Sequence, residues 1–212
     1  MSLLTIFGVD YRARVQNAVA ALSRGVGIIL IDDEDRENEG DLIFAATQLC
    51  VDDVVRMIRD CSGIICLCLT AEKAQQLQLR PMVENNTSPF QTAFTVSIEA
   101  RTGVSTGVSA YDRWVTIKAA TQVNATSEHL RQPGHVFPLI ARDGGVLTRR
   151  GHTEGSIDLL KMVKIEPSAV LCELMNVDGT MKKLPQLVDY ALNNQLTIVS
   201  IDDIHKVMIE SL

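Results

Sequence analysis

A single run of acidic residues constrains this sequence more than any other feature. Residues 32–41 hold seven aspartates and glutamates and one arginine, and this segment accounts for the formal net charge of −6 of the 212-residue chain. The run directly follows the apolar segment 27–31, which has the composition of a buried strand. Carboxylates crowded at the end of a buried strand repel one another unless cations lie among them.

Four acids of this run, Asp35, Glu37, Glu39 and Asp41, occupy alternate positions. In an extended segment these side chains lie on one face and point toward one spot. The pattern indicates a site for a divalent cation, and the sequence leaves a solvated acidic loop open as the alternative. An EF-hand is excluded, because a calcium loop that begins at Asp35 has Ala46 instead of a glutamate at its twelfth position.

The composition predicts one globular domain with a full core. The chain is 46% hydrophobic but only 4% aromatic, so we expect an aliphatic core. The negative charge and the lack of a basic stripe argue against nucleic acid as a partner. Five cysteines without a Cys-x-x-Cys spacing predict buried, unpaired thiols. With no secretory pattern and no membrane-length apolar stretch, we expect a cytoplasmic protein that does not contact a membrane.

Helix-type and strand-type patterns alternate along the chain at irregular spacing. This favours an α+β (mixed α/β) fold in which one mixed sheet is flanked by helices on both sides. Pro138 predicts that its strand is an edge strand or irregular. The expected helices are 15–22, 52–60, 71–79, 109–121, 184–194 and segments from 153 and from 200; the expected strands are 27–31, 63–69, 93–98, 136–140, 145–148, 168–174 and 196–199.

A second informative segment is 144–154. Here a short extended stretch leads into a turn with Arg149 and Arg150, and Thr153 opens a helix. Free N–H groups at the start of a helix, together with a guanidinium, suit a phosphate group. A capped helix with solvated arginines and a structural His152 is the alternative that this pattern leaves open.

Two more residues are candidates for chemistry. His135 follows Gly134 in an extended segment, whereas His129 and His205 lie in polar or helical surroundings that indicate surface positions. Glu173 ends an apolar strand, so its carboxyl group is either exposed or held in a site that shifts its pKa.

Four segments in order resemble the signature motifs of the 3,4-dihydroxy-2-butanone 4-phosphate synthase family. The first is the acidic run 32–41. The others read Thr-Gly-Val-Ser-Ala-Tyr-Asp-Arg at 106–113, Arg-Gln-Pro-Gly-His-Val-Phe-Pro at 131–138 and Arg-Arg-Gly-His-Thr-Glu at 149–154. The resemblance covers residues from about 10 to 205. It implies a single synthase domain over residues 1–212, without the fused GTP cyclohydrolase II domain that some members carry.

The resemblance also implies an activity. The family converts D-ribulose 5-phosphate into L-3,4-dihydroxy-2-butanone 4-phosphate and formate for riboflavin biosynthesis, with Mg²⁺ and as a homodimer that shares its active sites. The metal-site chemistry allows one or two ions and Mn²⁺ as a substitute. Two alternatives stay open: another metal-dependent sugar-phosphate isomerase or aldolase, and a metal-binding protein without catalysis. Release of formate distinguishes the synthase from both.

The resemblance assigns roles to particular residues. Glu37 and His152 would bind the metal. His135, Glu173 and Cys66 would take part in catalysis. The residues expected to contact the substrate are Arg36, Glu37, Asp41, Thr106, Arg149, Arg150, Gly151, His152, Thr153 and Glu173, among which Arg150 occupies a variable position in the family.

Overall fold

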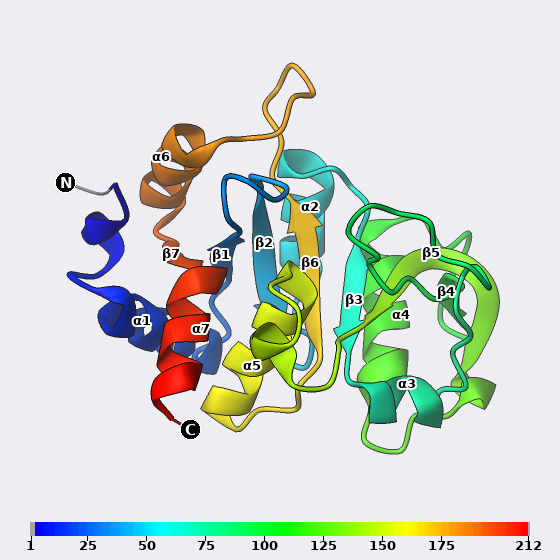
Figure 1. The fold of residues 1–212 in the computed structure, drawn as a ribbon. Helices are drawn as coiled ribbons and strands as arrows, with labels where there is room; N and C mark the ends of the chain where they lie inside the picture. Colours follow the sequence, from blue (N-terminus) through cyan, green and yellow to red (C-terminus); the bar gives the residue numbers. More distant parts are fainter. Residues whose placement is uncertain (1–2, 212) are drawn as a thin grey trace.

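One mixed sheet of seven strands forms the centre of the computed structural model, which describes residues 3–211 (Figure 1). The strand order is β4-β5-β3-β6-β2-β1-β7. Strand β1 pairs in parallel with β7 and β3 with β5, and the other neighbours are antiparallel. The bounds are β1 Ile28–Ile31, β2 Gly40–Ala45, β3 Cys66–Leu69, β4 Ile98–Ala100, β5 Leu130–Ile140, β6 Ala169–Glu173 and β7 Thr197–Ser200.

Helices cover both faces of this sheet. One face packs against α1, α5 and α7, and the other shares its core with α2, α3, α4 and α6 (Figure 1). The α-helices are α1 Tyr11–Ser23, α2 Val51–Asp60, α3 Ala71–Gln76, α4 Ala110–Thr121, α5 His152–Val163, α6 Leu184–Asn194 and α7 Ile201–Glu210. The predicted fold, a mixed sheet with helices on both sides in a single domain, is confirmed.

Strand β1 shows why its sequence is apolar throughout. Ile28 and Leu30 belong to the core cluster beneath α1, α5 and α7, whereas Ile29 and Ile31 belong to the cluster on the opposite face. A strand that is covered on both faces needs apolar side chains at consecutive positions. The core is aliphatic, as expected from the composition.

The cysteines are unpaired, as predicted, and four of the five are buried. Cys50 is exposed, so the expectation of burial is wrong at this position. It lies at the N-cap of α2, where Asp53 accepts hydrogen bonds from both its backbone N–H and its thiol. The helix therefore begins at Val51, one residue before the predicted start at Asp52.

Four strand predictions differ from the structure. The strand expected over 93–98 corresponds to β4, Ile98–Ala100, and overlaps it only at Ile98. Strand β2 was not predicted, because the acidic run masks its first two residues, Gly40 and Asp41. Strand β5 is longer than expected and lies inside the sheet, between β4 and β3. Pro138 is tolerated there because it lies beyond the β4 pairing, which ends at Val136. The segment Gly145–Leu147 forms a 3₁₀ turn instead of a strand.

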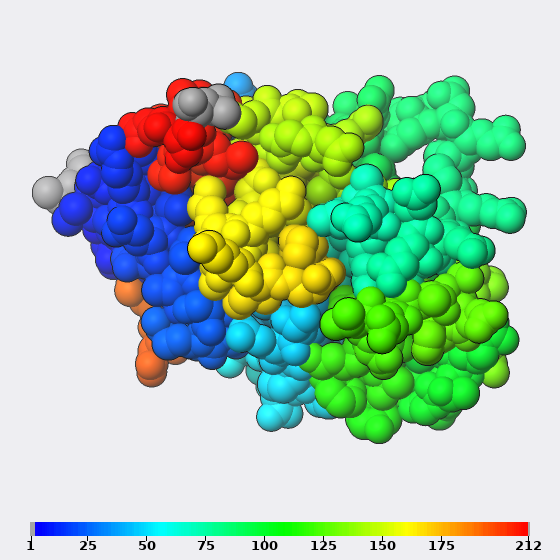
Figure 2. All heavy atoms as spheres, turned by 90° about the horizontal axis from the view of Figure 1, so that it is seen from below, coloured from blue at the N-terminus to red at the C-terminus, as the bar shows by residue number. Residues whose placement is uncertain are grey.

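The segment between α3 and β4 stands out from the body of the molecule when the protein is seen from below (Figure 2). Residues 81–91 are mostly exposed, yet Phe90 reaches back over the face that carries the site described next. Across residues 3–211, no helix has the length and apolar character needed to cross a bilayer.

Candidate metal site and cavity

Asp32 organises the acidic segment. It directly follows β1, and its side chain is fully buried. Its Oδ2 and Oδ1 atoms accept hydrogen bonds from the backbone N–H groups of Glu37 and Glu39, both at 2.9 Å. Arg36 Nη1 also donates to Oδ2 at 2.9 Å. These contacts compensate the burial of the carboxylate and fold residues 32–39 into a compact loop.

The face of four alternating carboxylates that the sequence predicted does not form. Residues 34–37 are turns, and Asp35 is exposed. Glu37, Glu39 and Asp41 do line one cavity. Asp32 was missed as a member of the site, although its position as the first acid after a buried strand was the available signal.

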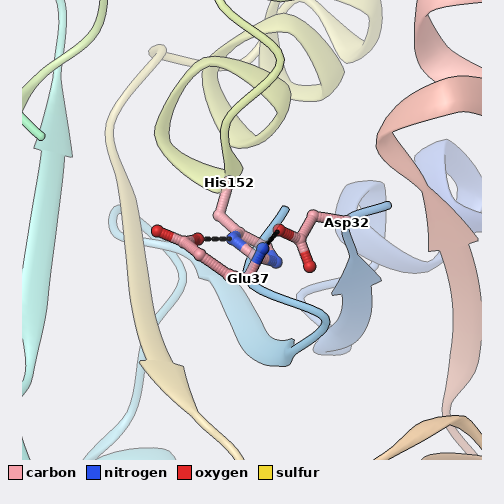
Figure 3. Close-up of side chains that lie close together, drawn as sticks. All are labelled: Asp32, Glu37 and His152. Atoms are coloured by element: carbon pink, nitrogen blue, oxygen red, sulfur yellow. Dashed lines mark hydrogen bonds and ion pairs between the residues drawn. The ribbon is translucent and has the colours of Figure 1, made fainter. Parts of the chain in front are cut away.

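Helix α5 brings His152 to this loop. Gly151 is the N-cap and His152 the first helical residue, so the helix begins one residue before Thr153, the expected first residue. His152 Nδ1 lies 3.4 Å from Glu37 Oε2 and 3.9 Å from Asp41 Oδ2. Ligand atoms of Asp32, Glu37 and His152 all lie within 4.8 Å of one another, and these side chains converge from the loop and from the first turn of α5 (Figure 3).

The electrostatics of this cluster favour positive charge. Burial, reinforced by neighbouring carboxylates, raises the pKa of Asp41 to about 8. Burial by itself lowers the pKa of His152, but the carboxylates of Asp41 and Glu37 outweigh it and raise the pKa to about 9. Burial likewise raises the pKa of Glu37, but His152 and Arg36 outweigh it and hold that pKa below its usual value. At neutral pH, a proton on His152 therefore places a positive charge among the carboxylates, and a bound cation can take the place of this charge.

Two buried atoms, Asp41 Oδ1 and His152 Nε2, have no hydrogen-bond partner among the described residues. An unpaired buried polar atom costs free energy, so both atoms are suited to a ligand. Carboxylate oxygens combined with one imidazole nitrogen suit Mg²⁺ or Mn²⁺. The residues present therefore fit a divalent ion.

A cavity of about 170 Å³ lies beside this cluster. Its walls combine carboxylates, two arginines and apolar side chains, and most of the residues singled out in the sequence meet here. Those predicted residues are Arg36, Glu37, Asp41, Cys66, Arg149, His152, Thr153 and Glu173. Glu39, which the alternating pattern placed in the cation site, also lines the cavity, and Thr92, Phe94, Leu139 and Leu171 complete the lining without having been predicted as site residues.

The turn before α5 closes one side of the cavity. Arg149 Nη1 donates to the buried Glu154 carboxylate at 2.6 Å, and Arg149 Nη2 donates to Phe90 O and to Thr92 Oγ1 at 3.0 and 3.1 Å. Gly151 is needed here, because a Cβ atom would lie 2.1 Å from Arg149 Nη1. With glycine as N-cap, no side chain caps the first N–H groups of α5. Such a helix start beside a guanidinium suits an anion.

Comparison with known proteins identifies the family. The sequence profile described as 3,4-dihydroxy-2-butanone 4-phosphate synthase matches residues 16–207. The chain is 57% identical over 203 residues to a 3,4-dihydroxy-2-butanone 4-phosphate synthase of Desulfotalea psychrophila, covering 96% of this chain and 94% of that protein. The chain belongs to the 3,4-dihydroxy-2-butanone 4-phosphate synthase family. It is also 55% identical to the synthase of Shewanella loihica, over 96% of this chain and 93% of that protein.

Solved synthase structures have the same fold. One, in complex with two magnesium ions, superposes with a TM-score of 0.85 at 36% identity, over 89% of this chain and 93% of that chain. A two-domain synthase from A. baumannii gives a TM-score of 0.86 at 43% identity over 90% of this chain, which spans 56% of that longer protein. The predicted family is therefore confirmed, and this chain is an enzyme of that family.

Glu173 and Cys66 lie at the ends of neighbouring strands beside the cavity. Glu173 pairs with Asp41 across β6 and β2, and its Oε2 accepts a hydrogen bond from Ser62 Oγ at 2.5 Å. Burial raises the pKa of the Cys66 thiol well above its usual value, so it is protonated at neutral pH. The synthase roles that the sequence suggested for these two residues stay predictions, and Ser62 is a further contact that the sequence did not signal.

Of the residues expected in the synthase site, Gly151 is not among those that line the cavity, and three others lie elsewhere in the single chain. His135 is on β5, its side chain is 47% exposed, and its Nδ1 lies 2.8 Å from Glu99 Oε2. Thr106 is exposed in the segment before α4. Arg150 bonds to acidic side chains away from the cavity. None of the three lines the cavity within residues 3–211. Of the other histidines, His129 is exposed, as expected, and His205 is half-buried.

Proposed function

We propose that this chain converts D-ribulose 5-phosphate into L-3,4-dihydroxy-2-butanone 4-phosphate and formate, as a cytoplasmic enzyme of riboflavin biosynthesis. The observation that carries the proposal is one cavity in which the Glu37–His152 cluster faces the Arg149 turn. A sugar phosphate needs both ends of such a cavity, one for its hydroxyl and carbonyl oxygens and one for its phosphate. Family membership supports the same substrate.

Glu37 and His152 would hold the metal, Mg²⁺ with Mn²⁺ as a substitute, as one or two ions. Asp32 is less suited to be a ligand, because its two oxygens already accept bonds from Glu37 N, Glu39 N and Arg36. Its part is to hold the loop in place. When bound, a divalent ion stabilises the negative charge that an enediolate gathers on adjacent oxygens. His152 must give up its proton to bind the ion.

Acid–base groups surround the sugar end of the cavity. Burial raises the pKa of Asp41 to about 8, which suits its carboxyl group to proton exchange near neutral pH. Glu173 is anchored by Ser62 on the neighbouring wall, where it can accept one. The reaction needs enolisation, loss of one water, a carbon shift and uptake of one water as formate leaves. Separate acids and bases are required for these successive transfers.

The phosphate end is assigned to residues 149–153. Arg149 offers a guanidinium, and the uncapped N–H groups at the start of α5 offer neutral donors. Phe90 and Thr92 bond to Arg149 from the exposed segment between α3 and β4. That segment would cover the substrate when it is bound and exclude water from the reacting atoms.

A second copy of the chain would supply His135 and Thr106. Both are exposed and outside the cavity, although the resemblance gives them roles in it. The exposed apolar side chains of Ile64 and Val108 lie beside Arg113, which donates to the neighbouring carbonyls Gly63 O and Val108 O. Because Ile64 is two residues before Cys66, which begins β3 and lines the cavity, this apolar surface supports a homodimer with shared sites.

Proton NMR of ribulose 5-phosphate incubated with the protein and Mg²⁺ tests the activity. We expect the formate resonance to grow in step with the four-carbon product. EDTA should stop this growth, and added Mg²⁺ or Mn²⁺ should restore it. Conversion to another sugar phosphate without formate would establish an isomerase or aldolase instead. Bound Mg²⁺ with unchanged ribulose 5-phosphate would establish a binding protein without this activity.

A further inference from the structure

Arg150 is directed away from the cavity, although Arg149 before it and His152 two residues after it line the cavity. Its Nη2 lies 3.1 Å from Asp33 Oδ2 and 3.0 Å from Asp202 Oδ1. Its Nε atom is buried and has no hydrogen-bond partner among the described residues. The guanidinium of Arg150 thus forms ion pairs with two carboxylates from distant parts of the sequence.

These two carboxylates belong to segments that are held in different ways. Asp33 lies in the acidic loop, next to Asp32, and no strand or helix holds the loop between β1 and β2. Asp202 lies in the first turn of α7, which Ser200 caps through the N–H of Asp203 and which Arg14 of α1 ties down through a buried ion pair. Arg150 therefore links the loop to an anchored helix.

We propose that Arg150 is a positioning residue that holds the acidic loop in its metal-binding arrangement. The inference rests on the proposed magnesium site. Arg150 precedes His152 by two residues, so its bond to Asp33 fixes one metal ligand's helix against the loop that carries the other, Glu37. Lys183 holds the far end of the loop by donating to Asn38 O at 2.8 Å.

The physical reason is preorganisation. Residues 32–41 carry seven acidic side chains, which repel one another and favour an open loop until a cation binds. If the loop is already closed, ordering it costs less free energy when the ion binds, and the ion binds more tightly. Because the ion pairs of Arg150 are partly exposed, we expect Arg150→Ala to weaken Mg²⁺ binding by only about three- to tenfold.

This role differs from the substrate contact that the resemblance implied for position 150. A phosphate ligand would raise the KM for ribulose 5-phosphate at every Mg²⁺ concentration. A positioning residue raises the Mg²⁺ requirement, and the KM returns to the wild-type value when Mg²⁺ is saturating.

Four variants test the proposal by Mg²⁺ titration calorimetry and by hydrogen exchange of residues 32–39 in the metal-free protein. Arg150→Ala should weaken Mg²⁺ binding and speed exchange in the loop, and Arg150→Lys should restore most of both. Asp202→Asn removes the anchor at a distance from the metal site and should act in the same direction. Lys206→Ala is the matched control, because Lys206 bonds to Asp202 at 2.6 Å but does not contact the loop; it should leave both measurements unchanged.

Each outcome decides the matter. Wild-type Mg²⁺ affinity and loop exchange in both Arg150→Ala and Asp202→Asn would overturn the proposal, as would an equal effect of Lys206→Ala, which would indicate a general disturbance of α7. If Arg150→Ala does not fold, Asp202→Asn alone carries the test. Failure of the wild type to bind Mg²⁺ would instead remove the proposed metal site itself.

Discussion

The two histidines proposed to act in this protein lie in contrasting surroundings. His152 is buried at the start of α5, and the carboxylates of Glu37 and Asp41 that lie beside its Nδ1 belong to its own chain. His135 is on β5, 47% exposed, and its Nδ1 contacts Glu99 Oε2. The comparison teaches that the cluster around His152 forms within one chain, whereas His135 would reach a site only in the homodimer proposed above.

The prediction with the largest expected effect tests the cluster around His152. Glu37→Gln removes a proposed metal ligand, so we expect turnover to fall by several orders of magnitude and Mg²⁺ binding by calorimetry to be lost. Asp35→Asn is the matched control, because Asp35 is in the same loop but is exposed, and it should keep both. Equal losses in the two variants would point to the summed charge of the loop instead of a specific ligand.

The second prediction tests the proposed acid–base groups, His135 from the second copy and Glu173 beside the cavity. His135→Ser and Glu173→Gln should each lower formate production by about 10²-fold or more, the scale of general acid–base catalysis, while the Tm stays near the wild-type value. His135 is exposed, so its replacement should cost little stability. Early melting of either variant would favour a structural role.

Subunit mixing sharpens this second test. Glu37→Gln and His135→Ser chains, inactive apart, should recover roughly a quarter of the wild-type activity when unfolded together and refolded, because half of the dimers then carry one intact shared site. No recovery, with mixed dimers shown by mass spectrometry, would mean that His135 acts within its own chain or not at all.

The third prediction concerns the phosphate end. Arg149→Ala should weaken substrate binding by about 2–3 kcal/mol, the scale of a lost charge-assisted hydrogen bond, and should also lower the Tm because it leaves Glu154 buried without its partner. Inorganic phosphate should compete with substrate in the wild type and much less in the variant. Arg142→Ala, at an exposed arginine outside the cavity, serves as the control. A KM equal to the wild type would exclude Arg149 as the anchor.

The smallest expected effect is on stability against pH. The folded-state pKa values of Asp41, about 8, and His152, about 9, both lie above their ordinary values, so the metal-free folded state binds more protons than the unfolded state. The free energy of unfolding is then greatest at the acid side of this range and falls as the pH rises from about 6.5 to about 9. We expect a Tm decrease of roughly 3–6 °C over this range, measured by calorimetry in EDTA. Saturating Mg²⁺ should abolish it, and a flat or rising Tm would contradict the assignment.

The sequence by itself determined the layers of the fold and much of the candidate site. The apolar run at β1 and the last helix, expected from residue 200, depend on neighbours in the chain, and so these elements form close to where they were predicted. The concentration of acids in residues 32–41 and the Arg149–Thr153 turn likewise identify the two ends of the cavity, because charge density and helix starts are local properties.

Only the tertiary structure decided how those residues meet. Alternation predicted Asp35 in the metal cluster, but the backbone bonds accepted by Asp32 turn the loop so that Asp32 and Glu37 face His152, which lies more than a hundred residues away in sequence. The interior position of β5, the direction of Arg150 and the exposure of His135 were equally out of reach. Each depends on contacts between distant segments, and a periodic pattern in one segment carries no information about which distant segment packs against it.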